Sequence, residues 1–208
     1  MRTLAIETAS EACSVALFEG GAMLSHEHRV PGRGHAEALV PMIAALPDKG
    51  QASCILVSLG PGSFTGVRIG LATARALGFA WGAEVLGYPT LALIAAQAQA
   101  VRPGQPLTVC VNGGHGEWFV QDFVGGAAAS DLCSLTPEAA RARGAQAVLA
   151  GSRARAFADL LGGDRVALDL LPDAAAVGQV PQALLTARLA PIYGRGPDAT
   201  PMAQKVRA

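Results

Sequence analysis

The first hundred residues alternate short apolar runs with longer stretches of helical spacing, an order typical of α/β proteins. Residues 3–7, 14–19 and 22–28 predict three strands, joined by the polar loop 8–12 and a Gly20-Gly21 turn. Apolar residues recur every three or four positions over 35–46 and predict a helix, in which Pro41 favours a kink or a late start. A strand over 54–59, a helix ending near Trp81, a strand over 84–86 and a helix over 90–101 follow.

The second half of the chain opens in the same way. Strands are predicted over 107–111, 117–123 and 147–149, with helix starts at Pro137, at Ser152 and at Pro172 or Asp173. The stretch 102–106, with two prolines and a glycine, is the best linker. Two halves that each begin as a β-meander and continue as α/β crossovers predict a duplicated α/β fold. We expect one lobe over 1–102, an abbreviated second lobe over 107–208 and a cleft between them.

The helix after Gly66 is apolar nearly all round. Between Val67 and Trp81 its only charges are Arg68 and Arg75. One face carries Val67, Leu71, Ala74 and Gly78, and another carries Ile69, Ala72, Ala76 and Phe79. Such a helix is buried on more than one side. One side can pack on the chain's own sheet, and the other side suggests a partner.

Two polar segments have both a structural and a functional interpretation. The loop 60–66 is glycine-rich but has neither the G-x-x-x-x-G-K-S/T spacing nor the G-x-G-x-x-G spacing, so a structural turn and an anion site both stay open. Its Ser63 or Thr65 is the expected N-cap. Around the first hairpin, a carboxylate and three hydroxyls either hold a nucleotide phosphate and Mg²⁺ or make local turn hydrogen bonds: Glu7, Thr8, Ser10 and Ser14.

Composition narrows the function classes. The 208 residues are 51% hydrophobic, and the zero net charge lacks the basic footprint of a stand-alone nucleic-acid binder. No apolar run approaches the ~20 residues of a membrane span, and no signal-peptide pattern follows Arg2, so a soluble cytoplasmic protein is expected. The four cysteines, Cys13, Cys54, Cys110 and Cys133, are scattered without metal spacing, and three of them fall within apolar runs that are typical of the core.

The other histidines and arginines singled out favour solvated surfaces over binding sites. His26 and His28 share a strand face without a third ligand nearby, which indicates a solvated face. Four arginines of the second half predict solvated helix faces, with a weak RNA contact as the alternative: Arg141, Arg143, Arg153 and Arg155. No Ser/His/Asp or paired-carboxylate constellation can be assembled.

Three motifs resemble one family. Residues 6–17 (IETASEACSVAL), 35–43 (HAEALVPMI) and 60–74 (GPGSFTGVRIGLATA) are similar to the TsaB (YeaZ) family, and residues 191–199 resemble its tail. Residues 125–178 resemble it only loosely. The resemblance implies a two-lobed actin/Hsp70-like ATPase (ASKHA) fold and a role in making threonylcarbamoyladenosine in tRNA.

The same resemblance implies partners rather than catalysis. It implies a scaffold whose first-lobe helices pack against those of the catalytic paralogue TsaD, with the ATPase TsaE as a third partner. It further implies a homodimer when the chain is alone, indirect tRNA contact and no membrane. The expected interface residues are His35, Leu39, Val40, Met42, Ile43, Val67, Arg68, Leu71, Ala74, Arg75 and Trp81.

The resemblance also argues against chemistry in this chain. The paralogue's H-x-x-x-H metal pair corresponds to Thr90 and Ile94, so we expect no metal, no catalytic residue and at most vestigial nucleotide binding. The family's usual Asp-Ala-Arg run is Asn112-Gly113-Gly114 here, which puts any function of that run in doubt. The main alternative is an ATP-dependent phosphotransferase of the same fold superfamily. A metalloprotease is a third reading, disfavoured by the loss at Thr90 and Ile94.

Overall fold

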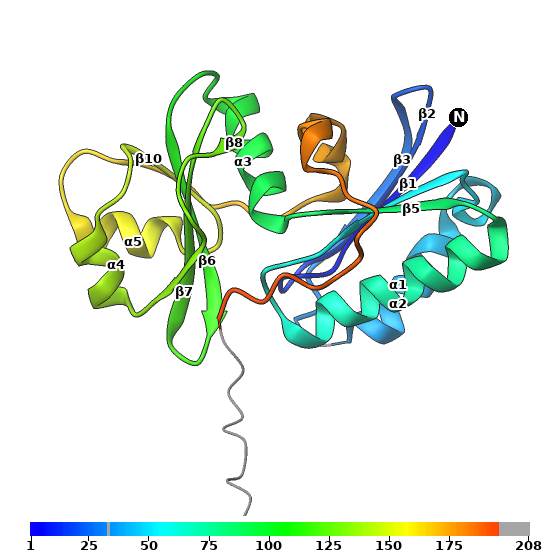
Figure 1. Ribbon diagram of the computed structural model, residues 1–208, viewed down its shortest axis with the longest axis horizontal. Coiled ribbons are helices and arrows are strands. Elements are labelled where there is room, and N and C mark those ends of the chain that lie inside the picture. Colours follow the sequence, from blue (N-terminus) through cyan, green and yellow to red (C-terminus); the bar gives the residue numbers. More distant parts are fainter. Residues whose placement is uncertain (33, 196–208) are drawn as a thin grey trace, which may run out of the picture.

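The computed structural model describes residues 1–32 and 34–195 and contains two β-sheets, each with its own helices (Figure 1). The first sheet has the order β3-β2-β1-β4-β5. Its first three strands form an antiparallel meander, and the last two run parallel to β1. The strands are β1 (Arg2–Glu7), β2 (Cys13–Glu19), β3 (Ala22–Arg29), β4 (Cys54–Ser58) and β5 (Glu84–Tyr88).

Two helices cover one face of this sheet. They are α1 (His35–Ala45) and α2 (Phe64–Trp81), and a short 3₁₀ turn, η1 (Pro47–Gly50), follows α1. Their buried side chains form one apolar cluster with Leu4, Ile6 and Val15 of the sheet. Pro41 lies inside α1 on its exposed side, where water can replace the lost backbone bond, so the predicted late start of this helix is wrong.

The second sheet repeats the first in a shorter form. Its order is β11-β10-β6-β7-β8, with β9 also pairing with β7. The β6–β7–β9 meander corresponds to β1–β2–β3, and the parallel strands β10 and β11 correspond to β4 and β5. The strands are β6 (Leu107–Gly114), β7 (Glu117–Val124), β8 (Ala127–Ala128), β9 (Cys133–Leu135), β10 (Val148–Ala150) and β11 (Val166–Leu168).

The helices of the second sheet are the abbreviated part. The counterparts of α1 and α2, with 11 and 18 residues, are α4 (Pro137–Arg143) and α5 (Ala154–Leu161), with 7 and 8. The duplicated α/β architecture with a smaller second half is therefore confirmed. Sequence reasoning missed the short strands β8, β9 and β11 and began α5 too early, at Ser152.

One helix from each half packs across the boundary between the sheets. Helix α3 (Thr90–Val101) follows β5, yet Leu91, Ile94 and Ala98 pack in the core of the second sheet. The 3₁₀ helix η2 (Ala174–Gln179) follows β11 but packs against the first sheet through Ala174 and Val177. A further short helix, η3 (Gln182–Leu184), precedes residues 185–195. In Figure 1, α3 lies between the two sheets.

The predicted boundary between two lobes at 102–106 remains a prediction. The exchange of α3 and η2 joins the two halves, because each of these helices packs in a core shared with the other half. Within the described residues, no helix combines the length and the apolar character that crossing a bilayer requires. Residues 196–199 of the predicted tail lie outside the described part of the chain.

Candidate functional site

The glycine-rich loop before α2 packs on the chain's own first hairpin. A Cβ atom at Gly62 would lie 1.9 Å from the carbonyl oxygen of Ala9, and one at Gly66 would lie 2.0 Å from that of Thr8. The Ser63 amide donates to the Ala9 carbonyl at 2.6 Å, and the Ser63 hydroxyl accepts the Gly66 amide as the helix N-cap. These glycines therefore allow two backbones to touch, which supports the structural interpretation of the loop.

Helix α2 buries one apolar face and exposes a second stripe of apolar residues. Val67, Leu71 and Ala74, which were expected at the partner interface, are instead buried against the sheet. On the opposite side, Ala72 and Ala76 are exposed, and the side chain of Phe79 is 93% exposed. A phenylalanine held in water on a regular helix forgoes most of its burial free energy. This face is thus a candidate interaction surface.

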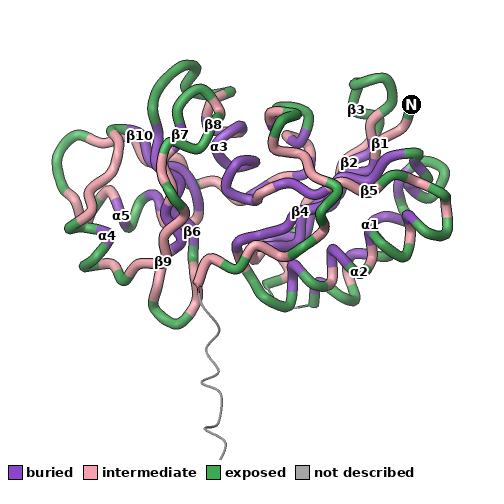
Figure 2. The backbone as a smooth tube through the Cα atoms, viewed as in Figure 1, coloured by how far each residue is buried: buried purple, intermediate pink, exposed green. Residues whose placement is uncertain are grey.

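Helix α1 extends this surface. It contacts α2, and its exposed residues Ala36, Val40 and Ala44 recur every four positions, so they form one stripe. The Val40 side chain is 57% exposed. Figure 2 shows exposed stretches on the sides of α1 and α2 that face away from the sheet. We call the surface formed by these two stripes, from Ala36 to Ala44 and from Ala72 to Phe79, the helical face.

The structure separates the expected interface residues into two groups. Val40, Arg68 and Arg75 are exposed, and Trp81 is half-buried. The others are buried inside the first half and can support the helical face but not contact a partner in this conformation: His35, Leu39, Met42, Ile43, Val67, Leu71 and Ala74. The sequence had no way to assign these faces, because a helix with apolar residues on every side shows no preferred direction.

A cleft of about 1090 Å³ lies between the two halves. The first half contributes Ser10, Ser63 and Arg68 to its wall. Thr90 and Ile94 of α3 also line it, together with the turn 112–114. Thr90 and Ile94, which stand where the paralogue has its two metal-binding histidines, therefore line the same cleft as residues 112–114, which stand where the family usually has Asp-Ala-Arg. Among the described residues, no cluster of three or more His, Cys, Asp or Glu side chains is arranged to hold a metal ion.

The polar group predicted around the first hairpin is mostly sealed. Glu7, Thr8 and Ser14 are fully buried, and of the four residues only Ser10 is part of the cleft wall. Thr8 donates to the Gly66 carbonyl at 2.8 Å, and the Ser10 hydroxyl accepts the Ala12 amide at 3.0 Å. Hydrogen bonds within the chain thus occupy the side chains of Thr8, Ser10 and Ser14, and only that of Ser10 is a local turn bond.

Glu7 is the unusual member of this group. One carboxyl oxygen accepts the Ala9 amide at 2.7 Å, whereas the other has no hydrogen-bond partner among the described residues. Burial raises the pKa of Glu7 to about 7, although the nearby Ala9 amide and the hydroxyls of Ser58 and Tyr88 oppose that rise.

Two polar connections near this group escaped sequence reasoning. The hydroxyls of Ser58 and Thr90 share a hydrogen bond of 2.5 Å, which links the cleft-lining Thr90 to a buried residue of β4. Asp173 accepts from Ser14 at 3.0 Å and lies 2.7 Å from the His26 ring nitrogen. Asp173 was noticed only as a possible helix start, and its distant partners leave no local pattern.

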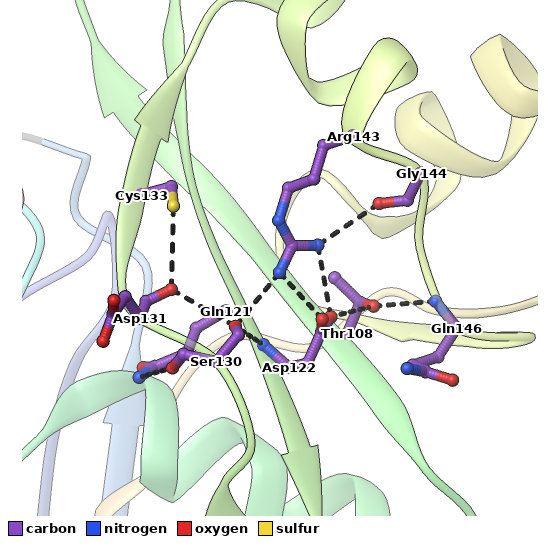
Figure 3. Close-up of polar contacts among 9 residues, drawn as sticks. All are labelled: Thr108, Gln121, Asp122, Ser130, Asp131, Cys133, Arg143, Gly144 and Gln146. Atoms are coloured by element: carbon purple, nitrogen blue, oxygen red, sulfur yellow. Dashed lines mark hydrogen bonds and ion pairs between the residues drawn. The ribbon is translucent and has the colours of Figure 1, made fainter.

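Two of the four arginines singled out in the second half, Arg143 and Arg155, form ion pairs within the chain. Arg143 forms a bidentate pair with Asp122, at 2.7 and 3.3 Å, and also donates to Ser130 (Figure 3). Asp122 in turn accepts from Thr108 at 2.6 Å. Arg155 pairs with Asp169 at 3.1 Å on the surface. Arg143 is therefore a brace between α4 and β7 rather than a solvated side chain.

Three of the four cysteines are buried, as expected. Cys13, Cys54 and Cys110 lie in the apolar interior. Burial raises the pKa of the Cys13 thiol to about 11 and that of Cys110 to about 12, so both are protonated and inert near neutrality.

Comparisons with known proteins agree with this architecture. The family described as "TsaD: tRNA N6-adenosine threonylcarbamoyltransferase" matches residues 29–149. The tRNA threonylcarbamoyladenosine biosynthesis protein TsaB of Escherichia coli (strain K12) is 35% identical over 130 residues, which cover 59% of this chain and 55% of that protein. The Haemophilus influenzae (strain ATCC 51907 / DSM 11121 / KW20 / Rd) protein of the same name is 39% identical over 102 residues, covering 47% and 42%. The alignments thus span about half the length of these curated relatives.

Solved structures extend the likeness to nearly the whole chain. YeaZ from Pseudomonas aeruginosa superposes with a TM-score of 0.76 at 29% identity, covering 92% of this chain and 99% of that one. A crystal structure of an uncharacterized protein with similarity to peptidase YEAZ, from the same organism, gives 0.78 at 26% identity, covering 93% and 99%. The predicted two-lobed actin/Hsp70-like fold is confirmed, and the chain belongs to the TsaD-type family, in its TsaB/YeaZ branch.

Proposed function

We propose that this chain supports the synthesis of threonylcarbamoyladenosine in tRNA by binding a TsaD-type paralogue through its helical face. The observation that carries the proposal is the exposed apolar surface of α1 and α2, with Phe79 93% exposed at its end. The names of the curated relatives supply the pathway.

The chemistry of the helical face fits a helical partner. Ala72 and Ala76 are small, so the backbone of another helix can approach closely there, and Phe79 offers a large apolar anchor. A stable pair of proteins buries ~1,600 Å² in total, which a second helix pair laid across α1 and α2 can provide. The buried residues Leu39 and Leu71 fix both helices to the sheet, so the face is preformed.

The residues of the cleft support a non-catalytic role. Thr90 uses its hydroxyl in a bond to Ser58, and Ile94 has no donor atom. We therefore assign transfer chemistry to the paralogue. The main alternative, an ATP-dependent phosphotransferase, would need phosphate ligands in the cleft. Three of the four residues expected to hold a phosphate, Glu7, Thr8 and Ser14, are buried and do not line it.

The test is sedimentation velocity of the chain alone and mixed with the TsaD-type paralogue from the same organism. Wild type is compared with Ala76→Asp, at the middle of the helical face, and with Val101→Asp, an exposed position at the end of α3. We expect a mixed complex that Ala76→Asp loses and Val101→Asp keeps, with all three proteins equally folded by circular dichroism. A wild type that ignores the paralogue, or an Ala76→Asp variant that still binds, overturns the proposal.

We propose three further partners, of which only the second copy of this chain is argued from the helical face. Alone at high concentration, two copies should associate through the helical face, and Ala76→Asp should abolish this. The ATPase TsaE is proposed as a third component, and tRNA as an indirect one. An upward thermal shift of the isolated chain at millimolar ATP–Mg²⁺ would instead favour the phosphotransferase.

A further inference from the structure

The C-terminal segment 186–194, which we call the strap, runs along the first half beside α2. It begins at Thr186, which exchanges two backbone hydrogen bonds with Gly87 at the edge strand β5. The Ile192 amide then donates to the Leu59 carbonyl at 2.7 Å, and Leu189 and Ile192 pack on the apolar cluster of the first half. In Figure 1, this orange-to-red segment runs from β5 toward the second sheet.

Two side chains of α2 clamp the strap. Arg75 donates to the Leu189 carbonyl at 2.6 Å, and Arg68 donates to the Tyr193 hydroxyl at 3.2 Å. The Arg68 guanidinium also lies 3.4 Å from the ring centroid of Phe64, and that ring is 5.6 Å from the ring of Tyr193. Arg68 and Arg75 are the only charged residues of α2, and both are exposed beside Ala72 and Ala76 of the helical face.

The far end of the strap reaches the second half. Gly194 lies so close to Phe119 of β7 that a Cβ atom there would be 2.3 Å from the ring. Ile192, Tyr193 and Gly194 also form part of the cleft wall. The strap therefore touches α2, the cleft and β7 within a few residues.

We propose that the strap couples the helical face to the cleft, and that a partner carrying two carboxylates releases it. Each arginine holds the strap through a neutral oxygen, and a carboxylate accepts a stronger, charge-assisted bond. Arg68 and Arg75 are seven residues apart, about 10 Å along the helix axis. The fitting partner is thus a helix with acidic residues at i and i+7, lying along Ala72 and Ala76. Its docking draws both guanidiniums away from Leu189 and Tyr193, and the strap side of the cleft loosens.

The clamp can be tested in the chain alone by amide hydrogen exchange. The Ile192 amide, bonded to Leu59, reports the strap, and the Thr186 amide, bonded to Gly87, is the internal reference. The Arg68→Ala/Arg75→Ala double variant should exchange at Ile192 roughly tenfold faster, with Thr186 unchanged. Arg141→Ala, an exposed arginine of α4, is the matched control and should change neither amide. Unaltered exchange at Ile192 in the double variant overturns the clamp.

The release of the strap rests on the proposed function, which identifies the partner. The release and the proposed function can nevertheless fail separately. In the complex with the TsaD-type paralogue, exchange at the wild-type Ile192 amide should rise toward that of the double variant. A complex that forms while this exchange stays constant or falls overturns the release but leaves the proposed function intact. If no complex forms, the proposed function and the release step both fail, and the clamp is decided by the arginine variants.

Discussion

At the scale of single residues, the most consequential side chain is the buried carboxyl of Glu7. It sits at the end of β1, fully removed from solvent, with one oxygen unpaired within the described residues. An ionised carboxylate without a full set of partners is costly in such a place. The structure therefore favours its protonated form, and this preference makes the stability of the fold depend on pH.

Replacing Glu7 by Gln should remove that dependence. Because the folded pKa is raised to about 7 from an ordinary 4.5, the stabilising protonated state is fully present below pH 4.5 and is lost as pH rises toward 7. At pH 8 the Glu7→Gln variant should be more stable than wild type by about 3 kcal/mol, and at pH 4 the two should be nearly equal. Urea denaturation at both pH values measures this. Glu84→Gln, at an exposed glutamate, is the control, and an equal pH slope for wild type and Glu7→Gln would contradict the prediction.

Arg143 and Arg155 offer a second comparison between matched residues. The pair of Arg143 with Asp122 is largely buried, with side-chain exposures of 21% and 17%, whereas the pair of Arg155 with Asp169 is open to solvent. We expect Arg143→Ala to lower the free energy of unfolding by about 2 kcal/mol, because it leaves a buried carboxylate without its charge partner. Arg155→Ala should change it by less than ~0.5 kcal/mol. If urea denaturation shows that both variants lose the same free energy of unfolding, the hydrogen-bond network in Figure 3 does not stabilise the fold.

At the scale of elements, α2 depends on glycines that helix propensity alone would disfavour. An alanine at Gly66 would gain about 1 kcal/mol of helix propensity. Its Cβ atom, however, would lie 2.0 Å from the backbone oxygen of Thr8, which cannot move without shifting the first hairpin. Gly66→Ala should therefore be destabilising by about 3 kcal/mol in thermal or urea unfolding. Gly178→Ala, where nothing lies near the new atom, should be neutral, and a neutral Gly66→Ala would refute the close packing.

The elements themselves were largely predictable, whereas their faces were not. Helix α3 begins and ends as predicted, because apolar residues fill it and a proline precedes it. The three-residue strands β9 and β11 were missed, since such short pieces are set by pairing with a neighbour rather than by their own pattern. The burial of Leu39 and Leu71 and the exposure of Phe79 depend on where the sheet lies, and no local signal in an all-apolar helix reveals that.

At the scale of the whole molecule, the exchange of α3 and η2 ties the two halves together. Each packs in a core built partly by the other half. We expect one cooperative thermal transition, with equal calorimetric and van't Hoff enthalpies, for the full chain. A fragment ending at residue 106 should fail to fold, because Leu91, Ile94 and Ala98 would lose their core. Two separate transitions, or a monomeric folded fragment, would contradict this and favour independent domains.

The unequal lengths of the duplicated helices limit how many partners the molecule can bind through a surface of two long helices. The 18-residue α2 has a counterpart of only 8 residues, so the described part of the second half presents no equivalent long helix pair. A protein with one such binding surface forms closed pairs, with a second copy or with a related protein. Two such surfaces at opposite ends would allow open-ended filaments to form. If the helical face binds as proposed, the shortening of α4 and α5 leaves a single surface of this kind, and assembly through such surfaces stops at a pair.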